Sequence, residues 1–172
     1  MKILIGIPCY NEFVHFMFLQ SMMRLKIPKG AEAKIIYSIG QWTMNAAQQF
    51  ADNAIEQNCD YMLFLSNDVG FPSNALEKLI DDDKDVVGGW ALGRTYPHAL
   101  HVVDKYDEKT GLFQIALSRE SGLQRVLGLG GEMVLYKIDA LKKLEPPFFY
   151  GKDMIAGKRV MTEDYYFAKR AM

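Results

Sequence analysis

The chain has 172 residues, a formal net charge of -1, 49% hydrophobic residues and 24% charged residues. This length fits one domain with a substantial core, and the near-neutral charge argues against nucleic acid as a main partner. The two cysteines, Cys9 and Cys59, are too few for a disulfide framework and match no zinc spacing, and the early apolar run is too short to span a membrane. We therefore expect one cytoplasmic domain without a transmembrane segment.

Strands and helices alternate along the first half of the chain. Apolar runs bounded by glycine, proline or polar residues predict strands at residues 2–8, 33–40, 61–66 and 85–91. Helical spacing of apolar residues predicts helices at 13–25, 42–57 and 73–80. The Met-rich and aromatic positions 13–23 are most simply interpreted as core. The alternation predicts an α/β fold with a Rossmann-like, mostly parallel central sheet flanked by helices.

The second half of the chain has a different pattern. Short extended pieces are expected at residues 99–106, 111–117 and 122–129, with a turn at 109–111, and they predict a small antiparallel addition. A further strand is expected at 131–137, a short helix at 138–144, and a long loop at 145–160. Thr162 is the expected N-cap of a last helix with acids in its first turn.

Three polar clusters follow predicted strands or lead into one. They are "PCYNE" at 8–12, "SNDVGFP" at 66–72 and "GLGGE" at 128–132. Ligands of open parallel sheets bind beyond the carboxyl ends of the strands. We therefore expect these clusters to converge on one crevice.

Asp68 follows the apolar run of the third predicted strand. A carboxylate on a rigid strand end is a suitable ligand for Mg²⁺ or Mn²⁺, and such an ion neutralises a diphosphate leaving group. The alternative is that Asp68 caps the turn before the helix that follows Pro72. The stretch itself leaves both interpretations open.

Glu163 and Asp164 form a second pair of candidate acids. An N-cap threonine followed by two acids is what any helix start favours. The pair also follows the long loop at 145–160, as expected where a carboxylate meets a substrate under a movable lid, and one of the two acids could serve as a general base.

Other candidates are weaker. His98 and His101 lie in a segment expected to be extended, which puts them on opposite faces and argues against a shared metal. The glycines at 128, 130 and 131 lack the dinucleotide fingerprint and are more typical of close backbone approach. The acidic run at 81–85 is typical of a solvated turn.

The ordered set of segments resembles family 2 glycosyltransferases of the GT-A fold, most closely the compact bacterial and phage-type members. The segments are "ILIGIPCYNE", "CDYMLFLSNDVGFPSNALEKLI", "DVVGG", "GLGGEMVLYKIDALKKL" and "TEDYYFAKRA", and together they extend over nearly the whole chain. The resemblance implies one GT-A domain, with residues 1–92 as the nucleotide-binding half and 93–172 as the acceptor-side half.

The resemblance also implies roles for individual residues. Asp68 corresponds to the second aspartate of the family's Asp-x-Asp motif and would bind Mn²⁺ or Mg²⁺. Asp164, with Glu163 beside it, corresponds to the catalytic base of inverting members. The implied nucleotide-sugar-binding residues are Pro8, Tyr10, Glu12, Asn45, Ser66, Asn67, Gly130, Gly131 and Glu132. The implied partners are a UDP- or GDP-linked nucleotide diphospho-sugar and an acceptor with a hydroxyl group.

The sequence departs from the family pattern in several places. Ser66 replaces the first aspartate of the metal motif, which predicts weaker metal affinity. Only Asn45 remains of an arginine-containing segment before the second helix, and the second predicted strand ends without the aspartate that many members use to read the base. Family members usually also continue beyond the last helix to another strand and a metal-binding histidine, so this chain is expected to be a minimal form, a fragment or a protein that has lost turnover. The expected function is inverting sugar transfer; the alternative is an inactive nucleotide-sugar-binding or structural relative.

Overall fold

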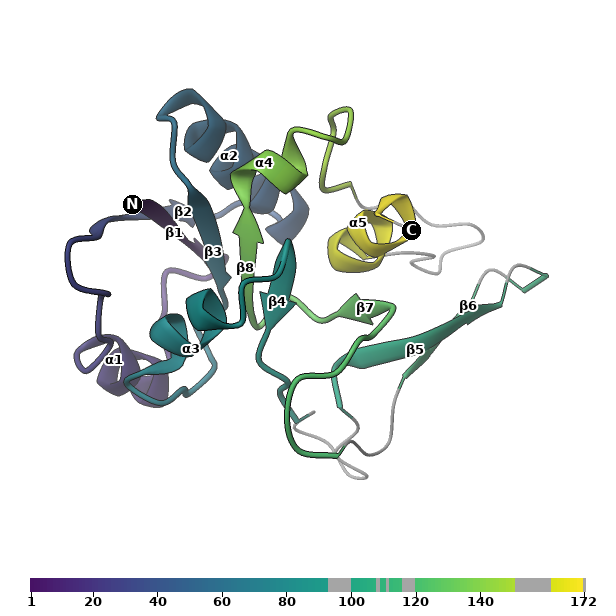
Figure 1. Cartoon of the computed structure of the whole chain (residues 1–172), viewed down its shortest axis with the longest axis horizontal. Helices are drawn as coiled ribbons and strands as arrows, with labels where there is room; N and C mark the ends of the chain where they lie inside the picture. The colour runs from purple at the N-terminus through teal and green to yellow at the C-terminus, as the bar shows by residue number, and fades with distance from the viewer. Residues whose placement is uncertain (93–99, 108, 111, 116–119, 151–161, 172) are drawn as a thin grey trace.

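The computed structural model of the protein describes residues 1–92, 100–107, 109–110, 112–115, 120–150 and 162–171, and Figure 1 shows the arrangement of the elements. The strands are β1 (Lys2–Cys9), β2 (Glu32–Ile39), β3 (Tyr61–Leu65), β4 (Val86–Gly88), β5 (Val102–Asp107), β6 (Leu112–Ile115), β7 (Gly128–Leu129) and β8 (Met133–Lys137). The helices are α1 (Phe16–Met22), α2 (Thr43–Glu56), α3 (Ala75–Asp81), α4 (Ile138–Leu141) and α5 (Glu163–Arg170). The predicted α/β class is confirmed.

The central sheet has five strands in the order β2-β1-β3-β8-β4. β1 is parallel to both β2 and β3, whereas β8 is antiparallel to its neighbours β3 and β4. The sheet is therefore mostly parallel, as the alternation predicts. The strand predicted at 131–137 does not extend an edge of the sheet but separates β3 from β4.

Pro8 does not end the first strand. β3 pairs with β1 only over residues 3–6, whereas β2 pairs with β1 as far as Cys9. The missing amide hydrogen of Pro8 therefore falls where β1 has a hydrogen-bonding neighbour on one side only, which is where a strand tolerates proline.

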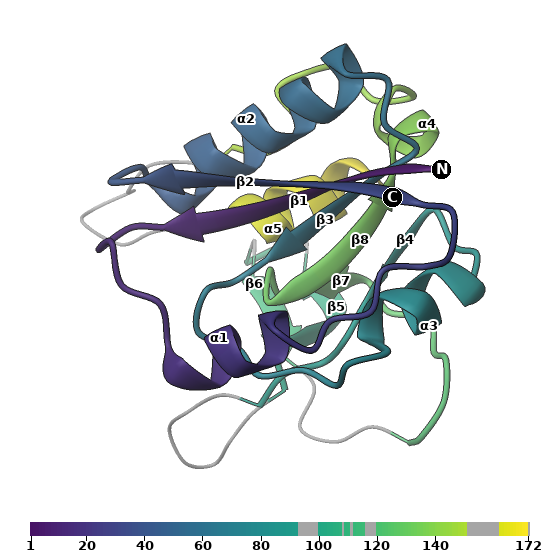
Figure 2. The ribbon, with the colours of Figure 1, turned by 90° about the vertical axis from the view of Figure 1, so that its left-hand side faces the viewer.

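Helices cover both faces of the central sheet. Figure 2 shows α2 on one side and α1 with α3 on the other. Phe50 of α2 packs with Phe64 of β3 in one buried cluster, and Phe18 of α1 packs with Leu76 of α3 in the other. Both cysteines are buried and unpaired, as expected of core thiols.

A second, three-stranded sheet has the order β6-β5-β7 and is antiparallel throughout. It is the antiparallel addition predicted for the second half of the chain. The strand predicted at 122–129 is short, because only Gly128 and Leu129 pair with β5. Of the loop expected at 145–160, residues 151–160 lie outside the described part of the chain, as does His98.

The interpretation of residues 13–23 as core is wrong for most of them. α1 is shorter than the predicted helix, and Phe18 is its fully buried residue. Phe13, Phe16 and Met23 are 80%, 72% and 81% exposed. The apolar composition suggested burial, but a seven-residue helix that lies on one face of a sheet can bury only one of its sides.

Candidate functional site

The turn before β8 meets the end of β3. Because β8 runs antiparallel to β3, the first residue of β8, Met133, lies opposite the last residue of β3, Leu65. The amide of Ser66 donates to the carbonyl of Glu132 over 2.8 Å, and the Ser66 hydroxyl donates to the carbonyl of Gly131 over 3.1 Å. Two of the three polar clusters in the sequence, 66–72 and 128–132, are therefore in direct contact.

Gly131 joins this turn to the last helix. Its carbonyl accepts a hydrogen bond from the Ser66 hydroxyl, and its backbone amide lies near the carboxylate of Asp164 in the first turn of α5 and lowers the pKa of that group. A side chain at this position would contact the Phe64 ring, which an added Cβ would approach to 3.2 Å. The glycine therefore lets the backbone pass between the end of β3 and α5.

Asp164 is fixed by several donors. Its carboxylate accepts hydrogen bonds from the Thr162 hydroxyl and from the amide of Tyr165, the latter over 2.9 Å. Burial raises the pKa of the Asp164 carboxyl above its ordinary value of 3.8, and these hydrogen bonds oppose the rise. Thr162 precedes α5 as predicted, but its side chain serves the carboxylate instead of capping the helix.

An aromatic cluster fixes the helix that carries Asp164. Three aromatic rings pack together, with centroids 5.1 to 5.5 Å apart. They belong to Tyr136 in β8, to Phe149 in the segment after α4, and to Phe167 in α5. Phe167 lies three residues after Asp164, so this packing sets the position of the carboxylate relative to β8. Glu163, in the same turn of α5, is half-buried and, with Asp164, contributes to the raised pKa of the buried Tyr136 hydroxyl.

Glu132 is the second acid of this cluster. Its side chain is 17% exposed and pairs with Nδ1 of His101, whose side chain is 43% exposed. Burial raises the pKa of Glu132, the contact with His101 lowers it, and the charge of Asp164 adds to the rise. Burial, with smaller contributions from the charges of Asp164 and Glu132, raises the pKa of Tyr165 to about 12. Glu132 and Asp164 are thus close enough for each to oppose the ionisation of the other.

His101 is a site residue that the sequence interpretation missed. It precedes β5, and its backbone carbonyl accepts from the amide of Gly130 over 2.7 Å. A Cβ on Gly130 would lie 2.7 Å from the His101 Cβ and 2.5 Å from the Glu132 carboxylate. The glycine leaves room for the histidine and the glutamate to meet, which agrees with the close approach expected for these glycines.

Asn67 links the loop after β3 to the chain before α1. Its side-chain amide donates to the backbone carbonyl of Phe13 over 2.6 Å, and its backbone carbonyl accepts from the amide of His15 over 2.9 Å. The Asn67 side chain also hydrogen-bonds the Cys9 thiol, which partly offsets the rise in pKa that burial causes in that thiol. These contacts give Asn67 a structural role, whereas Asp68 is exposed at the same strand end.

The end of β1 carries an aromatic pair. The Tyr10 ring lies 5.3 Å from the ring of Trp42, the N-cap residue of α2, and both residues are about half exposed, at 52% and 54%. Trp42 was not among the predicted site residues. Glu12 is exposed with a φ of 61°, Asn45 is exposed in the first turn of α2, and Pro8 is buried in β1. Within the described part of the chain, none of these three residues shares a hydrogen bond or an ion pair with Glu132 or Asp164.

Asp68, the predicted metal ligand, is an exposed carboxylate. Residues 1–92 and the described parts of 100–171 contain no group of three His, Cys, Asp or Glu side chains arranged to hold a metal. Mg²⁺ commonly binds through one or two carboxylates and completes its coordination with water and substrate phosphates. Asp68 is one exposed carboxylate of the kind through which such an ion could bind.

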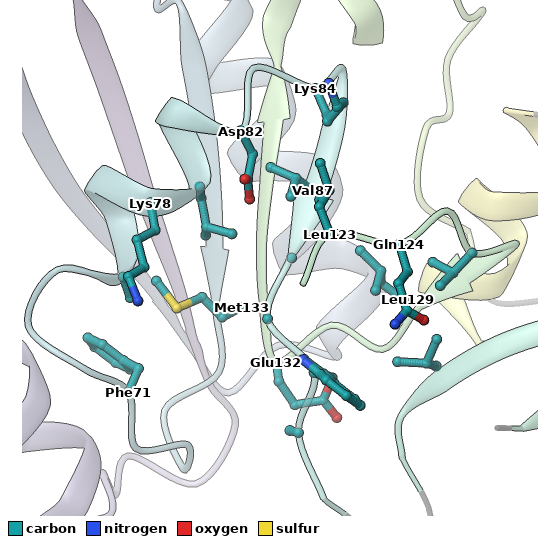
Figure 3. Close-up of a pocket in the computed structure, with 18 of the residues that line it drawn as sticks. Phe71, Lys78, Asp82, Lys84, Val87, Leu123, Gln124, Leu129, Glu132 and Met133 are labelled. Carbon is teal, nitrogen blue, oxygen red and sulfur yellow. The ribbon is translucent and has the colours of Figure 1, made fainter. Parts of the chain in front are cut away.

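Glu132 also lines a hollow of about 1060 Å³. Figure 3 shows Lys78 and Asp82 on one wall, Leu123 and Gln124 on the opposite wall, and Glu132 at one end. Of the predicted site residues, only Glu132 lines it. This hollow is large enough for a small organic molecule.

None of the described helices is both long and apolar enough to cross a bilayer. No family description and no curated protein matches the chain. The chain is similar to a solved structure, "Crystal Structure of A197 from STIV", with a TM-score of 0.66 and 20% sequence identity over 99% of this chain and 78% of that chain. At this identity the similarity concerns the fold alone: the chain shares its fold with the viral protein A197 from STIV.

Proposed function

We propose that this chain is a glycosyltransferase of the GT-A fold that moves a sugar, with inversion, from a UDP- or GDP-linked diphospho-sugar to an acceptor hydroxyl. The observation that carries the proposal is the position of Gly131, whose carbonyl accepts from the Ser66 hydroxyl at the end of β3 and whose backbone lies close enough to the Asp164 carboxylate to lower its pKa. Asp68, the predicted metal ligand, is two residues from Ser66. A candidate base and a candidate diphosphate site are therefore linked through one turn.

In the proposed reaction Asp164 is the general base. Its carboxylate takes the proton of the acceptor hydroxyl while that oxygen bonds to the anomeric carbon, and the bond from that carbon to the diphosphate breaks on the opposite face. The nucleoside diphosphate leaves with the bonding electrons. A raised pKa suits a base at neutral pH, and fixed hydrogen bonds hold the carboxylate in place.

Other residues supply binding. Asp68 would hold a divalent ion together with the donor diphosphate, and the ion would offset the charge that develops on the leaving group. Tyr10 and Trp42 offer exposed rings on which the nucleotide base can stack. The hollow that ends at Glu132 is proposed to hold the body of the acceptor; Asp164 does not line it, so the reacting hydroxyl would extend past Glu132 to reach the base.

The test uses UDP- and GDP-linked sugars with Mn²⁺. We expect one donor to raise the melting temperature and to release nucleoside diphosphate when an acceptor is added. Stabilisation without any turnover would support the alternative, a nucleotide-sugar-binding relative without activity. A chain that is neither stabilised nor active with any donor would contradict both.

A further inference from the structure

The helix α1 is apolar on sides that it does not bury. Its sequence is FMFLQSM, and Phe18 faces the core while Phe16, Met17 and Leu19 are exposed. Exposed apolar residues also flank the helix. Those of the whole segment are Phe13, Val14, Phe16, Met17, Leu19, Met23 and Ile27. Seven exposed large apolar side chains within residues 13–27 exceed the scattered single ones of an ordinary surface, and such a concentration normally marks a surface that a partner covers.

The helix is held rigidly at the outside of the molecule. The Phe71 amide donates to the Ser21 hydroxyl over 3.0 Å, and the contacts of Asn67 with Phe13 and His15 fix the preceding turn. Figure 2 shows α1 on the outer side of the sheet face that it covers. The apolar side chains are therefore presented from a fixed backbone.

The charged side chains of residues 13–31 have one sign, whereas the exposed acids Glu12 and Asp68 lie beside the segment. The sequence contains no Asp or Glu between Glu12 and Glu32, and Arg24, Lys26 and Lys29 in this interval are exposed. A partner that covers the apolar patch therefore meets cations at its edge. This combination of large apolar side chains and Lys or Arg is typical of helices that lie in the interface of anionic bilayers.

We infer that residues 13–29, here called the α1 patch, bind the surface of an anionic membrane. Phe13, Phe16 and Met23 enter the boundary between headgroups and acyl chains, and the cations of the patch contact lipid phosphates. A helix of seven residues is far too short to span a bilayer, so the contact is peripheral. Because α1 is hydrogen-bonded to the loop after β3, binding brings residues 66–71 close to the membrane. The inference does not depend on the proposed transfer reaction.

The test is flotation of the whole chain with vesicles of phosphatidylcholine containing about 30% phosphatidylglycerol. The double variant Phe16→Ser with Met23→Ser removes two exposed side chains of the patch. The matched control, Ile35→Ser with Ile39→Ser, removes two side chains of β2 that are 51% and 50% exposed and lie outside the α1 patch. Melting temperatures without vesicles check that both variants fold. A third variant replaces Arg24, Lys26 and Lys29 with glutamine.

We expect the wild type and the control to float with the anionic vesicles and the patch variant to bind at least about tenfold more weakly. The glutamine variant should bind the anionic vesicles about tenfold or more weakly than the wild type does. The wild type should lose as much binding affinity with neutral vesicles or in roughly 0.5 M salt. Wild-type protein that does not float, or equal losses in the patch variant and the control, would overturn the inference. So would a dimer in sedimentation velocity that the patch variant abolishes, because a second copy would then cover α1.

Discussion

The Ser66 hydroxyl donates a hydrogen bond to the carbonyl of Gly131 over 3.1 Å, between residues 65 positions apart in the chain. The family resemblance leads one to expect an aspartate at position 66. An ionised aspartate cannot donate to a carbonyl, and its charge would face the carbonyl oxygen. The serine therefore suits the contact between β3 and the turn before β8.

Ser66→Asp is expected to lower the free energy of unfolding by about 1 to 3 kcal/mol, because the partly buried carbonyl of Gly131 would then face a negative charge. Ser66→Ala is expected to lower it by about 1 kcal/mol, because the carbonyl only loses its donor. Urea unfolding measures both values. If Ser66→Asp instead kept full stability and strengthened Mn²⁺-dependent donor binding, the missing aspartate, and not the contact with Gly131, would be the important feature of this position.

Asp164→Asn is expected to reduce sugar transfer at least about a hundredfold, because the amide cannot accept the acceptor proton. Donor binding, measured by thermal shift, should change little, since the proposed role of Asp164 begins after the donor is bound. Glu163→Gln is compared under the same conditions. A larger loss of transfer in that variant would assign the base to Glu163.

The pH dependence of stability gives a second test of Asp164. An acid whose pKa is raised by folding binds more protons in the folded state, so its contribution to stability is complete below the ordinary pKa of 3.8 and is lost as the pH rises through the folded value. The melting temperature of the wild type should therefore fall relative to that of Asp164→Asn as the pH rises above 3.8 and through the raised pKa of the folded state. The lowered pKa values of Asp83 and Asp107 act in the opposite direction but equally in both proteins. A difference in melting temperature between the two proteins that does not change with pH would contradict the raised pKa of Asp164.

Mn²⁺ alone is expected to leave the melting temperature unchanged, because Asp68 is one carboxylate without two further His, Cys, Asp or Glu ligands among the described residues. Mn²⁺ with a nucleoside diphosphate should stabilise the protein, by about 2.7 kcal/mol at a ligand concentration a hundred times the dissociation constant. Asp68→Asn should remove the metal-dependent part of this stabilisation. An unchanged effect of Mn²⁺ in the variant would rule out Asp68 as the ligand.

Gly130→Ala is expected to destabilise the fold by about 1 to 3 kcal/mol, because the new methyl group would overlap the His101 Cβ and the Glu132 carboxylate. Gly89→Ala is the matched control, since a Cβ at Gly89 meets nothing within 4 Å. Chemical denaturation compares the two variants. If Gly130→Ala and Gly89→Ala were equally stable, His101 and Glu132 could move apart without a loss of free energy, and their contact would not contribute to the stability of the fold.

Local sequence signals were sufficient for the elements of the first half of the chain. β1, β2, β3 and α2 lie where apolar runs and helical spacing predict them, because each pattern matches the burial of a single strand or helix face. The polar residues after the third predicted strand also made Asp68 a candidate from the local pattern, whereas Ser66 and Glu132 became candidates through the family resemblance.

Long-range packing decided what the sequence pattern left open. The insertion of β8 between β3 and β4 brings Gly131 to Ser66, and the pairing of β5 with β7 brings His101 to Glu132. No local pattern encodes either contact, because the partners lie far apart in the chain. Composition likewise suggested that residues 13–23 are buried, but burial depends on whether a neighbouring segment covers each side of the helix, and only the tertiary structure shows that α1 is covered on one side.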